Sequence, residues 1–241
     1  MLRLLLLACL FAAPALADER RLLDAEEAAP YRAIGRLNIA GRRFCTATLI
    51  EPSLVLTAAH CLFNPRTGAR VPLAELRFVA GLRRGQVAAL GRPARAVPHP
   101  DFAFGAPDLA GVRADLALLE LAQPVGAADA TPIRVEEAGA GRFSIVSYGR
   151  GRAQVASIEG PCDAIAPIEG VMALDCAITF GVSGAPVLAA VDGPPRLVAL
   201  VSAMGRTTAG DRSIALAVPV GPQLAALRAA LDAAPGPVAP E

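Results

Sequence analysis

Short apolar segments alternate along this chain with stretches rich in glycine, proline and aspartate. They recur about every 8 to 12 residues, a spacing typical of the strands of β-barrels and β-sandwiches. The segments are Ala33–Ile39, Thr46–Leu56, Leu76–Val79, Leu116–Leu121, Ser144–Ser147, Ala185–Leu188, Leu197–Val201 and Ile214–Val220. Clear helical spacing is found in Pro222–Leu231, where Leu224, Leu227 and Leu231 share one face. We therefore predict an all-β fold with one helix at the C-terminal end.

The charge balance excludes several classes of protein. The 241 residues include 23 basic and 22 acidic side chains, for a net charge of +1, and 54% of the chain is hydrophobic. Such a chain has no strong basic field for nucleic acid, and it is too apolar to be disordered. We expect no nucleic-acid partner.

The first residues have the form of a secretory signal. Arg3 precedes an apolar stretch, and Ala15-Leu16-Ala17 forms an A-x-A cleavage site, so residues 1–17 are predicted to be removed near Ala17. The stretch between Arg3 and Pro14 is too short to span a bilayer. A lipoprotein signal cut at Cys9 is the weaker alternative, because it would leave a very short apolar region. We expect an exported protein, periplasmic or extracellular, with no membrane span.

The cysteines fit an exported protein. Without Cys9 the chain keeps Cys45, Cys61, Cys162 and Cys176, which allow three disulfide pairings. Pairing near neighbours would close two loops of about 15 residues, each worth about 3 kcal/mol. A zinc site is disfavoured, because the chain has no C-x-x-C pair and contains only two histidines. We expect disulfides and no metal.

The chain divides into two halves of similar length. Ala122–Thr131 resembles a linker, so we expect one β-domain over residues 30–125 and a second over 126–231, the latter with the terminal helix. Residues 18–29 form a leader and possible pro-segment, which a cut after Arg20 or Arg21 would remove. Residues 232–241, rich in alanine and proline, are expected to be a flexible tail.

Three segments carry residues suited to nucleophilic catalysis. Thr57-Ala58-Ala59-His60-Cys61 follows an apolar segment, Asp115 precedes Leu116–Leu121, and Gly181-Val182-Ser183-Gly184 places a serine between glycines. A serine hydroxyl needs a base within hydrogen-bond reach, and the base needs an acceptor that fixes its tautomer. Glycine beside the serine lets backbone amides converge on a developing oxyanion.

The order of these residues restricts the type of hydrolase. Both histidines, His60 and His99, precede Ser183, which excludes the serine–aspartate–histidine order of α/β-hydrolases. An aspartate ahead of the histidine would have to be Asp18 or Asp24, in the polar leader. The remaining order is His60, Asp115, Ser183, with Asp101 and Asp108 as rivals for the aspartate and His99 as a loop residue.

These motifs together resemble those of the trypsin/chymotrypsin-fold serine proteases, in particular the exported bacterial branch that includes glutamyl endopeptidases. The segment 57–61, TAAHC, is identical to the family's histidine motif. DLALLEL at 115–121 is similar to its aspartate motif, and GVSGAPV at 181–187 is a variant of its serine motif. HPDF at 99–102 and SYGR at 147–150 also resemble family segments.

The resemblance implies a fold and a set of roles. The fold would be two antiparallel six-stranded β-barrels, chymotrypsin-like, with a C-terminal helix. His60 would be the general base and then acid, Asp115 its orienting partner and Ser183 the nucleophile. The amides of Gly181 and Ser183 would form the oxyanion hole. Cys45 would pair with Cys61, the cysteine after the histidine.

Two positions depart from the family pattern. Trypsin-like members carry an aspartate before the serine, which pairs with a new N-terminus; here that residue is Val182. Ala177 stands where the aspartate of an arginine- or lysine-binding pocket would be. The inferred pocket walls are nearly uncharged, which favours cleavage after a small or medium apolar residue. They are Ala177, Ile178, Ser202, Met204, Gly205 and Ala215.

The sequence therefore predicts a serine endopeptidase that acts on polypeptides. Two alternatives remain open: a catalytically silent protein of the same fold that binds a partner, and an esterase on the same scaffold. We expect no cofactor, because the chain has no H-E-x-x-H motif, phosphate loop or dinucleotide fingerprint. We also expect a monomer.

Overall fold

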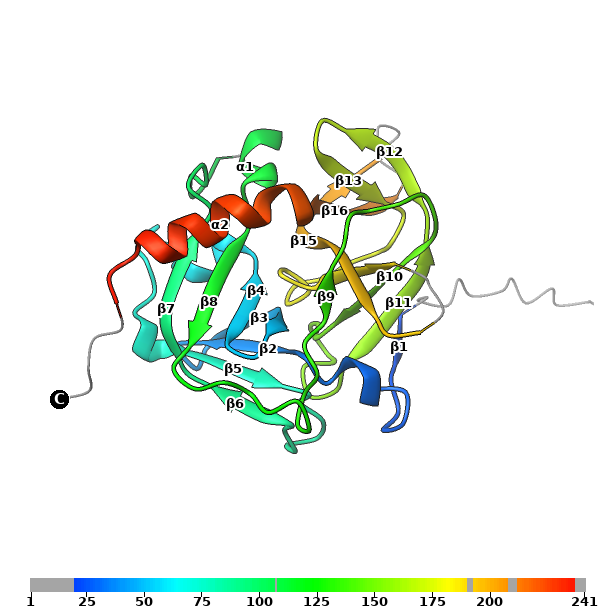
Figure 1. Ribbon diagram of the computed structural model, residues 1–241. Helices are drawn as coiled ribbons and strands as arrows, with labels where there is room; N and C mark the ends of the chain where they lie inside the picture. Colours follow the sequence, from blue (N-terminus) through cyan, green and yellow to red (C-terminus); the bar gives the residue numbers. More distant parts are fainter. Residues whose placement is uncertain (1–19, 107, 190–192, 208–211, 237–241) are drawn as a thin grey trace, which may run out of the picture.

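A computed structural model describes residues 20–106, 108–189, 193–207 and 212–236. The predicted signal peptide and its cleavage site lie outside these residues. The described chain forms two curled β-sheets with a helix across one side (Figure 1). The predicted all-β class with a C-terminal helix is confirmed.

The first sheet is antiparallel and curls back on itself. Within the described residues it has seven strands, in the order β6-β5-β2-β3-β4-β8-β7. Its strands are β2 Ile34–Ile39, β3 Arg43–Glu51, β4 Leu54–Thr57, β5 Leu76–Ala80, β6 Ala89–Gly91, β7 Pro93–Pro98 and β8 Ala117–Leu121. β6 and β7 are at opposite ends of this order, yet one residue, Arg92, separates them in the chain. The two edges must therefore come close, which closes the sheet toward a barrel.

The second sheet is also curled, and its described strands are antiparallel apart from one pair. Its main path is β1-β11-β10-β14-β15-β16-β13-β12, with β9 pairing in parallel to β15. Its strands are β1 Arg21–Leu22, β9 Arg134–Val135, β10 Phe143–Ser147, β11 Ser157–Cys162, β12 Ala164–Ile168, β13 Val171–Leu174, β14 Pro186–Ala189, β15 Arg196–Arg206 and β16 Ser213–Pro219. β11 and β12 adjoin in the chain but lie near opposite ends of the order, so this sheet curls too.

The strand counts differ from the six per barrel that the family resemblance implies. Over the described residues the sheets contain seven and nine strands. The additional strands are short edge pieces, such as the two-residue β1 and β9 and the three-residue β6. The apolar run Thr46–Leu56 also divides into β3 and β4, because Pro52 and Ser53 form a hairpin turn.

The helices are short apart from the last. They are α1 Leu109–Arg113 and α2 Gly221–Ala233, with 3-10 turns at Ala29–Tyr31, Ala59–Leu62 and Leu73–Glu75. The apolar face predicted for α2 is buried through Leu227 and Leu231, with Leu224 packed against the core. α2 continues two residues past the predicted end, because no helix breaker occurs before Pro235. No described helix is long and apolar enough to cross a membrane.

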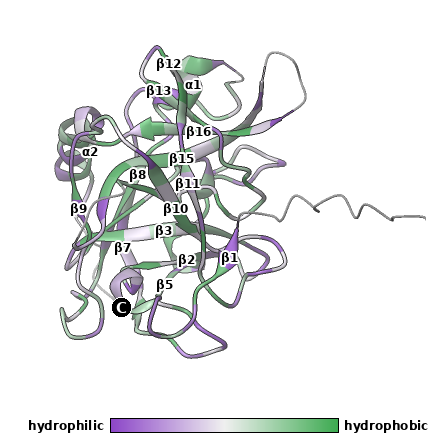
Figure 2. Cartoon of the chain, turned by 90° about the vertical axis from the view of Figure 1, so that its right-hand side faces the viewer, coloured by the Kyte–Doolittle hydropathy of each residue, from purple (hydrophilic) through white to green (hydrophobic). Residues whose placement is uncertain are grey.

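The first and last described elements each pack on the sheet formed by the other half of the chain. α2 contacts β7 and β8 of the first sheet, where Arg95 Nη1 donates to Leu231 O at 2.8 Å. β1 pairs with β11 of the second sheet, and the next residue, Leu23, is buried. Figure 2 shows this short hydrophilic strand at the side where the described chain enters the fold. Residues 20–29, predicted to be a leader, are thus part of the folded structure.

Candidate active site

Strand pairing brings His60 and Asp115 together. Thr57, the last residue of β4, pairs with Ala117, the first residue of β8. His60 lies three residues beyond Thr57, in a 3-10 turn, and Asp115 lies two residues before Ala117. Both side chains consequently project at the same end of the sheet. Nδ1 of His60 is 2.7 Å from Oδ2 of Asp115, and the His60 amide donates to Oδ1 at 2.8 Å.

Asp115 is a buried carboxylate with several donors around it. It is 4% exposed, and besides His60 it accepts a hydrogen bond from the Ser202 hydroxyl at 2.5 Å. The rival aspartates are placed elsewhere: Asp108 caps α1 through the Gly111 amide, and the side chain of Asp101 is 85% exposed. His99 is buried, and its Nδ1 accepts from the Asp101 amide at 3.2 Å.

Ser183 lies in a turn held against the first sheet. The Thr46 amide on β3 donates to Ser183 O at 2.9 Å, and the Thr46 hydroxyl donates to Gly181 O at 2.9 Å. Gly184 has a φ of +78° and packs so closely that an added methyl group would be 3.0 Å from the Ala58 nitrogen. The serine turn is therefore in contact with the segment that leads into His60.

Two amides in this turn remain available as donors. Gly181 has a φ of +92°, a conformation that L side chains rarely adopt. Among the residues that the structure describes, the amides of Gly181 and Ser183 donate no hydrogen bond, whereas those of Val182, Gly184 and Ala185 bind carbonyls. Two free N–H groups in one turn can stabilise a developing oxyanion, by about 3–4 kcal/mol per donor.

The arrangement is suited to proton transfer. A histidine that donates Nδ1–H to a carboxylate keeps its Nε2 free to accept a proton. The carboxylate also stabilises the imidazolium that this transfer creates. Burial of Asp115 limits competition from water, and the Ser202 hydroxyl satisfies part of its remaining hydrogen-bonding capacity.

The residues predicted to line a specificity pocket differ in their exposure to solvent. Ala177 and Met204 are exposed, whereas Ile178 and Ala215 are buried. Met204 pairs with Ala215 across β15 and β16, and Gly205 is the next residue on β15. The sixth residue, Ser202, is predicted as a wall of the pocket from its place in the family pattern, and its hydroxyl also donates to Asp115.

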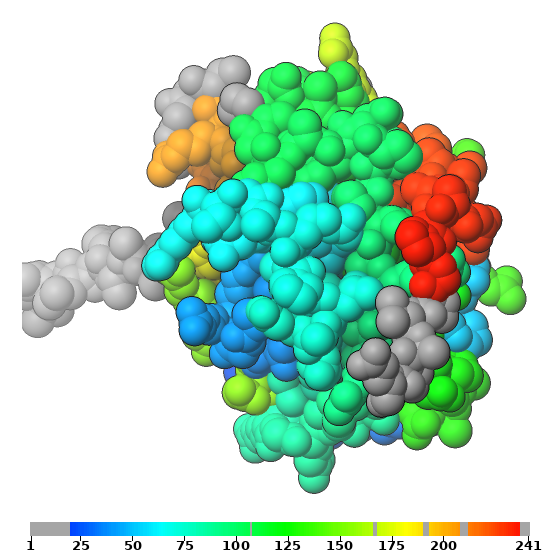
Figure 3. Space-filling view, turned by 90° about the vertical axis from the view of Figure 1, so that its left-hand side faces the viewer, coloured from blue at the N-terminus to red at the C-terminus, as the bar shows by residue number. Residues whose placement is uncertain are grey.

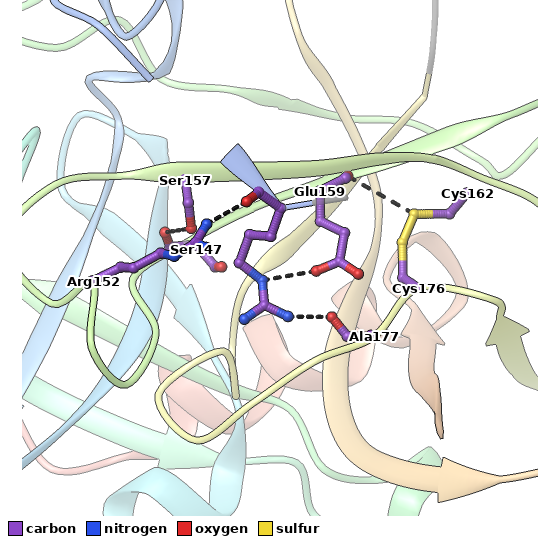
Figure 4. A network of polar contacts seen from close by, with 8 residues as sticks. Ser147, Arg152, Ser157, Glu159, Cys162, Cys176 and Ala177 are labelled. Atoms are coloured by element: carbon purple, nitrogen blue, oxygen red, sulfur yellow. Dashed lines mark hydrogen bonds and ion pairs between the residues drawn. A yellow bond between two sulfur atoms is a disulfide. The ribbon is translucent and has the colours of Figure 1, made fainter. Parts of the chain in front are cut away.

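Arg20, named in the sequence only as a possible cut site, contacts the segment ahead of the serine turn. Arg20 is 9% exposed, and its Nε is 2.8 Å from Oε2 of Glu159, which is 3% exposed. Its guanidinium also donates to the carbonyl of Ala177, and Arg152 binds the Arg20 carbonyl. Figure 4 shows Glu159, Ala177 and the neighbouring Cys162–Cys176 disulfide around this group. Arg20 and Glu159 are 139 residues apart, so local sequence carried no signal for the pair.

Two disulfides flank these elements. Cys45 bonds to Cys61, directly after His60, and Cys162 bonds to Cys176, directly before Ala177. The Cys45 and Cys61 sulfurs and a ring nitrogen of His60 lie within 4.8 Å of one another. Since the two sulfurs are bonded to each other, neither is a thiolate that could bind zinc.

Comparison with known proteins identifies the relatives of this chain. The family model described as Trypsin matches residues 24–226. Human kallikrein-15 is 34% identical over 123 residues, which cover 50% of this chain and 44% of that protein. The chain thus aligns with less than half the length of this relative.

Two solved structures have a fold similar to that of this chain. A Glu endopeptidase in complex with MPD superposes with a TM-score of 0.69 at 17% identity, over 89% of this chain and 97% of the other. A thermostable serine protease, AL20, from an extremophilic microorganism gives a TM-score of 0.64 at 17% identity, over 84% and 98%. The two-sheet architecture is thus that of known serine proteases, and the family match spans most of the sequence. The chain belongs to the trypsin family.

Proposed function

We propose that this protein is a serine endopeptidase whose catalytic residues are His60, Asp115 and Ser183. Ser183 attacks the scissile carbonyl while His60 accepts its proton, and Asp115 holds the imidazole and stabilises its charged form. His60 then protonates the leaving amine, and water hydrolyses the acyl-enzyme by the same route. The observation that carries the proposal is the His60–Asp115 pair, 2.7 Å apart, beside the serine turn.

We propose three further features of this enzyme. The amides of Gly181 and Ser183 form the oxyanion hole, supported by their lack of other acceptors in the described chain. Uncharged walls at Ile178, Met204 and Ala215 favour a small or medium apolar residue before the scissile bond. We further propose export after cleavage near Ala17, which the two disulfides support because such bonds persist in oxidising compartments.

The test is covalent labelling of the nucleophile. We expect the full mature chain to gain one adduct from a fluorophosphonate probe, measured by intact mass, and Ser183→Ala to gain none. Asp115→Asn should label far more slowly, because it leaves His60 in the wrong tautomer; losses of about 10⁴-fold in kcat are typical. The matched control, Asp101→Asn, changes an exposed aspartate and should label like the parent chain.

The alternative functions give other results. A folded, disulfide-bonded protein that gains no adduct, even after limited proteolysis near Arg20, would contradict the proposal and indicate a silent protein that binds a partner. Labelling that begins only after this cut would indicate a zymogen. Labelling together with ester turnover but no peptide cleavage would indicate an esterase. A preference for arginine, lysine or glutamate in a peptide-library digest would contradict the apolar specificity alone.

A further inference from the structure

A groove of about 870 Å³ lies on the first sheet, beside β3, the strand whose Thr46 binds the serine turn. One side is formed by the β2–β3 turn and the start of β3, and the other by residues 64–77. Figure 3 shows the chain around residue 40, in blue, next to the cyan segment after residue 60 on one face. We call this the arginine groove, after the residues that line it.

The lining is strongly cationic. Five arginines face one carboxylate, Glu75, an excess of four positive charges on a chain with a net charge of +1. The five are Arg42, Arg43, Arg66, Arg70 and Arg77. Within the described residues none of them lies within ion-pair distance of an acidic side chain. Some arginines elsewhere do pair with carboxylates, as in Arg95–Glu120 and Arg196–Glu136.

Several of these arginines are fixed by neutral acceptors. Arg43 donates to the carbonyls of Cys61 and Phe63, and Arg70 donates to Ala96 O at 2.7 Å. Arg77 donates to Ala74 O and Leu76 O. Carbonyls orient a guanidinium without cancelling its charge, so the groove keeps its positive potential.

The pKa values of arginines bound to carbonyls and of arginines paired with carboxylates shift in opposite directions. Burial lowers the pKa of Arg43 and of Arg70, whereas hydrogen bonding to Glu120 raises the pKa of Arg95. All three remain charged at neutral pH, because an arginine titrates far above it. An uncompensated, partly desolvated guanidinium is a strong attractor for an anionic ligand.

The groove approaches the proposed catalytic residues through Arg43. Arg43 binds the carbonyl of Cys61, the residue after His60, and it begins β3, whose Thr46 binds Ser183. Three residues of strand place Arg43 about 10 Å from that contact. Because His60 protonates the leaving amine, the polypeptide after the scissile bond leaves on the His60 side. An extended segment would reach the groove about three residues beyond the bond.

We propose that the arginine groove binds acidic side chains of a polypeptide substrate, in the stretch that follows the scissile bond. This rests on the proposed endopeptidase function and names a substrate class for it. Guanidinium groups pair with carboxylates in planar, bidentate geometry, and several of them along one groove select a run of aspartate and glutamate. A peptide held at Ser183 is favoured over other polyanions because the groove adjoins the catalytic residues.

The experiment compares two internally quenched peptides on the full mature enzyme. Both carry the same apolar residue before the scissile bond; positions three to six after it are Asp/Glu in one and Asn/Gln in the other. We expect kcat/KM to be about tenfold higher for the acidic peptide, from two to three surface ion pairs, and the preference to shrink in high salt. Equal kcat/KM values would overturn the proposal.

The variant that tests the groove is Arg42→Gln/Arg66→Gln. Both side chains are exposed, so folding should tolerate the change. We expect it to bring the ratio of the two kcat/KM values close to one. The matched control, Arg142→Gln/Arg228→Gln, removes two partly exposed arginines paired with Asp163 and Glu51, and should keep the ratio. A ratio preserved in the groove variant would overturn the proposal.

A binding measurement separates this proposal from the proposed function. Ser183→Ala should bind the fluorescent acidic peptide more tightly than its Asn/Gln counterpart, by anisotropy, and lose the difference with Arg42→Gln/Arg66→Gln. That result would support the groove even if neither peptide were cleaved. A lack of cleavage would contradict only the proposed endopeptidase function. Displacement of the peptide by heparin or DNA at far lower concentration than by unlabelled peptide would identify another polyanion as the occupant and overturn the proposal.

Discussion

A methyl group added at Gly184 has no room in this structure. It would lie less than 3.0 Å from the Thr46 carbonyl oxygen and the Thr57 hydroxyl, at a φ of +78°. Both neighbours belong to buried strands that cannot move aside. We therefore expect Gly184→Ala to displace the serine turn and to lose fluorophosphonate labelling, with a lower melting temperature.

A second glycine supplies the matched control. Gly85 has a similar φ of +85°, but an added methyl group there meets nothing within 4 Å. Gly85→Ala should cost about 1–2 kcal/mol of stability from backbone strain and leave labelling intact. Equal effects of the two changes on labelling would show that close packing at Gly184 does not position Ser183.

Single residues were predictable from the sequence where a local motif carries them. His60 lies in a specific five-residue motif, and the chain order selects Ser183 but leaves Asp101 and Asp108 as rivals of Asp115. Ser202 and Arg20 have no such motif: their contacts with Asp115 and Glu159 span 87 and 139 residues. Only the folded chain brings these pairs together, so a local pattern could not reveal them.

At the scale of elements, the Arg20–Glu159 pair fastens the first described residues to the second sheet. Both side chains are buried, so removing Arg20 takes away an ion-pair partner of Glu159 inside the protein. We expect Arg20→Met to lower the free energy of unfolding by about 3–5 kcal/mol, measured by chemical denaturation. Arg20→Met/Glu159→Leu should recover most of that loss, because it removes both charges of the buried pair.

An exposed pair provides the comparison for this prediction. Arg142 and Asp163 are 3.2 Å apart with side chains 57% and 61% exposed. Arg142→Met should change the free energy of unfolding by less than about 1 kcal/mol. If Arg20→Met changed the free energy of unfolding equally little, the buried Arg20–Glu159 pair would not stabilise the fold as described.

Elements were predictable where the apolar pattern is strong. The segments at Leu116–Leu121 and Ile214–Val220 correspond to β8 and β16, and the leucine spacing after Pro222 to α2. α1 went unpredicted because five residues, capped by Asp108, give too little periodicity. β1 is two exposed residues whose strand character comes from pairing with β11.

At the scale of the whole molecule, α2 covers the first sheet although the sequence places it after the second. Leu227 is fully buried and Leu231 is 6% exposed. Burial of such side chains contributes about 1.5–3 kcal/mol each. A chain that ends at Val220 should therefore unfold at a markedly lower temperature, measured by calorimetry.

A shorter truncation is the control for the helix. A chain that ends at Gly236 keeps all of α2 and should melt like the full-length protein. An unchanged melting temperature for the chain ending at Val220 would show that the helix does not stabilise the first sheet.

β1 pairs with the second sheet and α2 covers the first, so each sheet is completed by an element from the other half of the chain. This arrangement affects when the folded protein can form during synthesis. A polypeptide is made from its amino end, so His60 and Asp115 emerge long before Ser183 and α2. The first sheet lacks its covering helix, and β1 lacks its partner β11, until the later half has been synthesised. A nascent chain therefore cannot complete the proposed catalytic site, or cover its first sheet with α2, before its later half has been made.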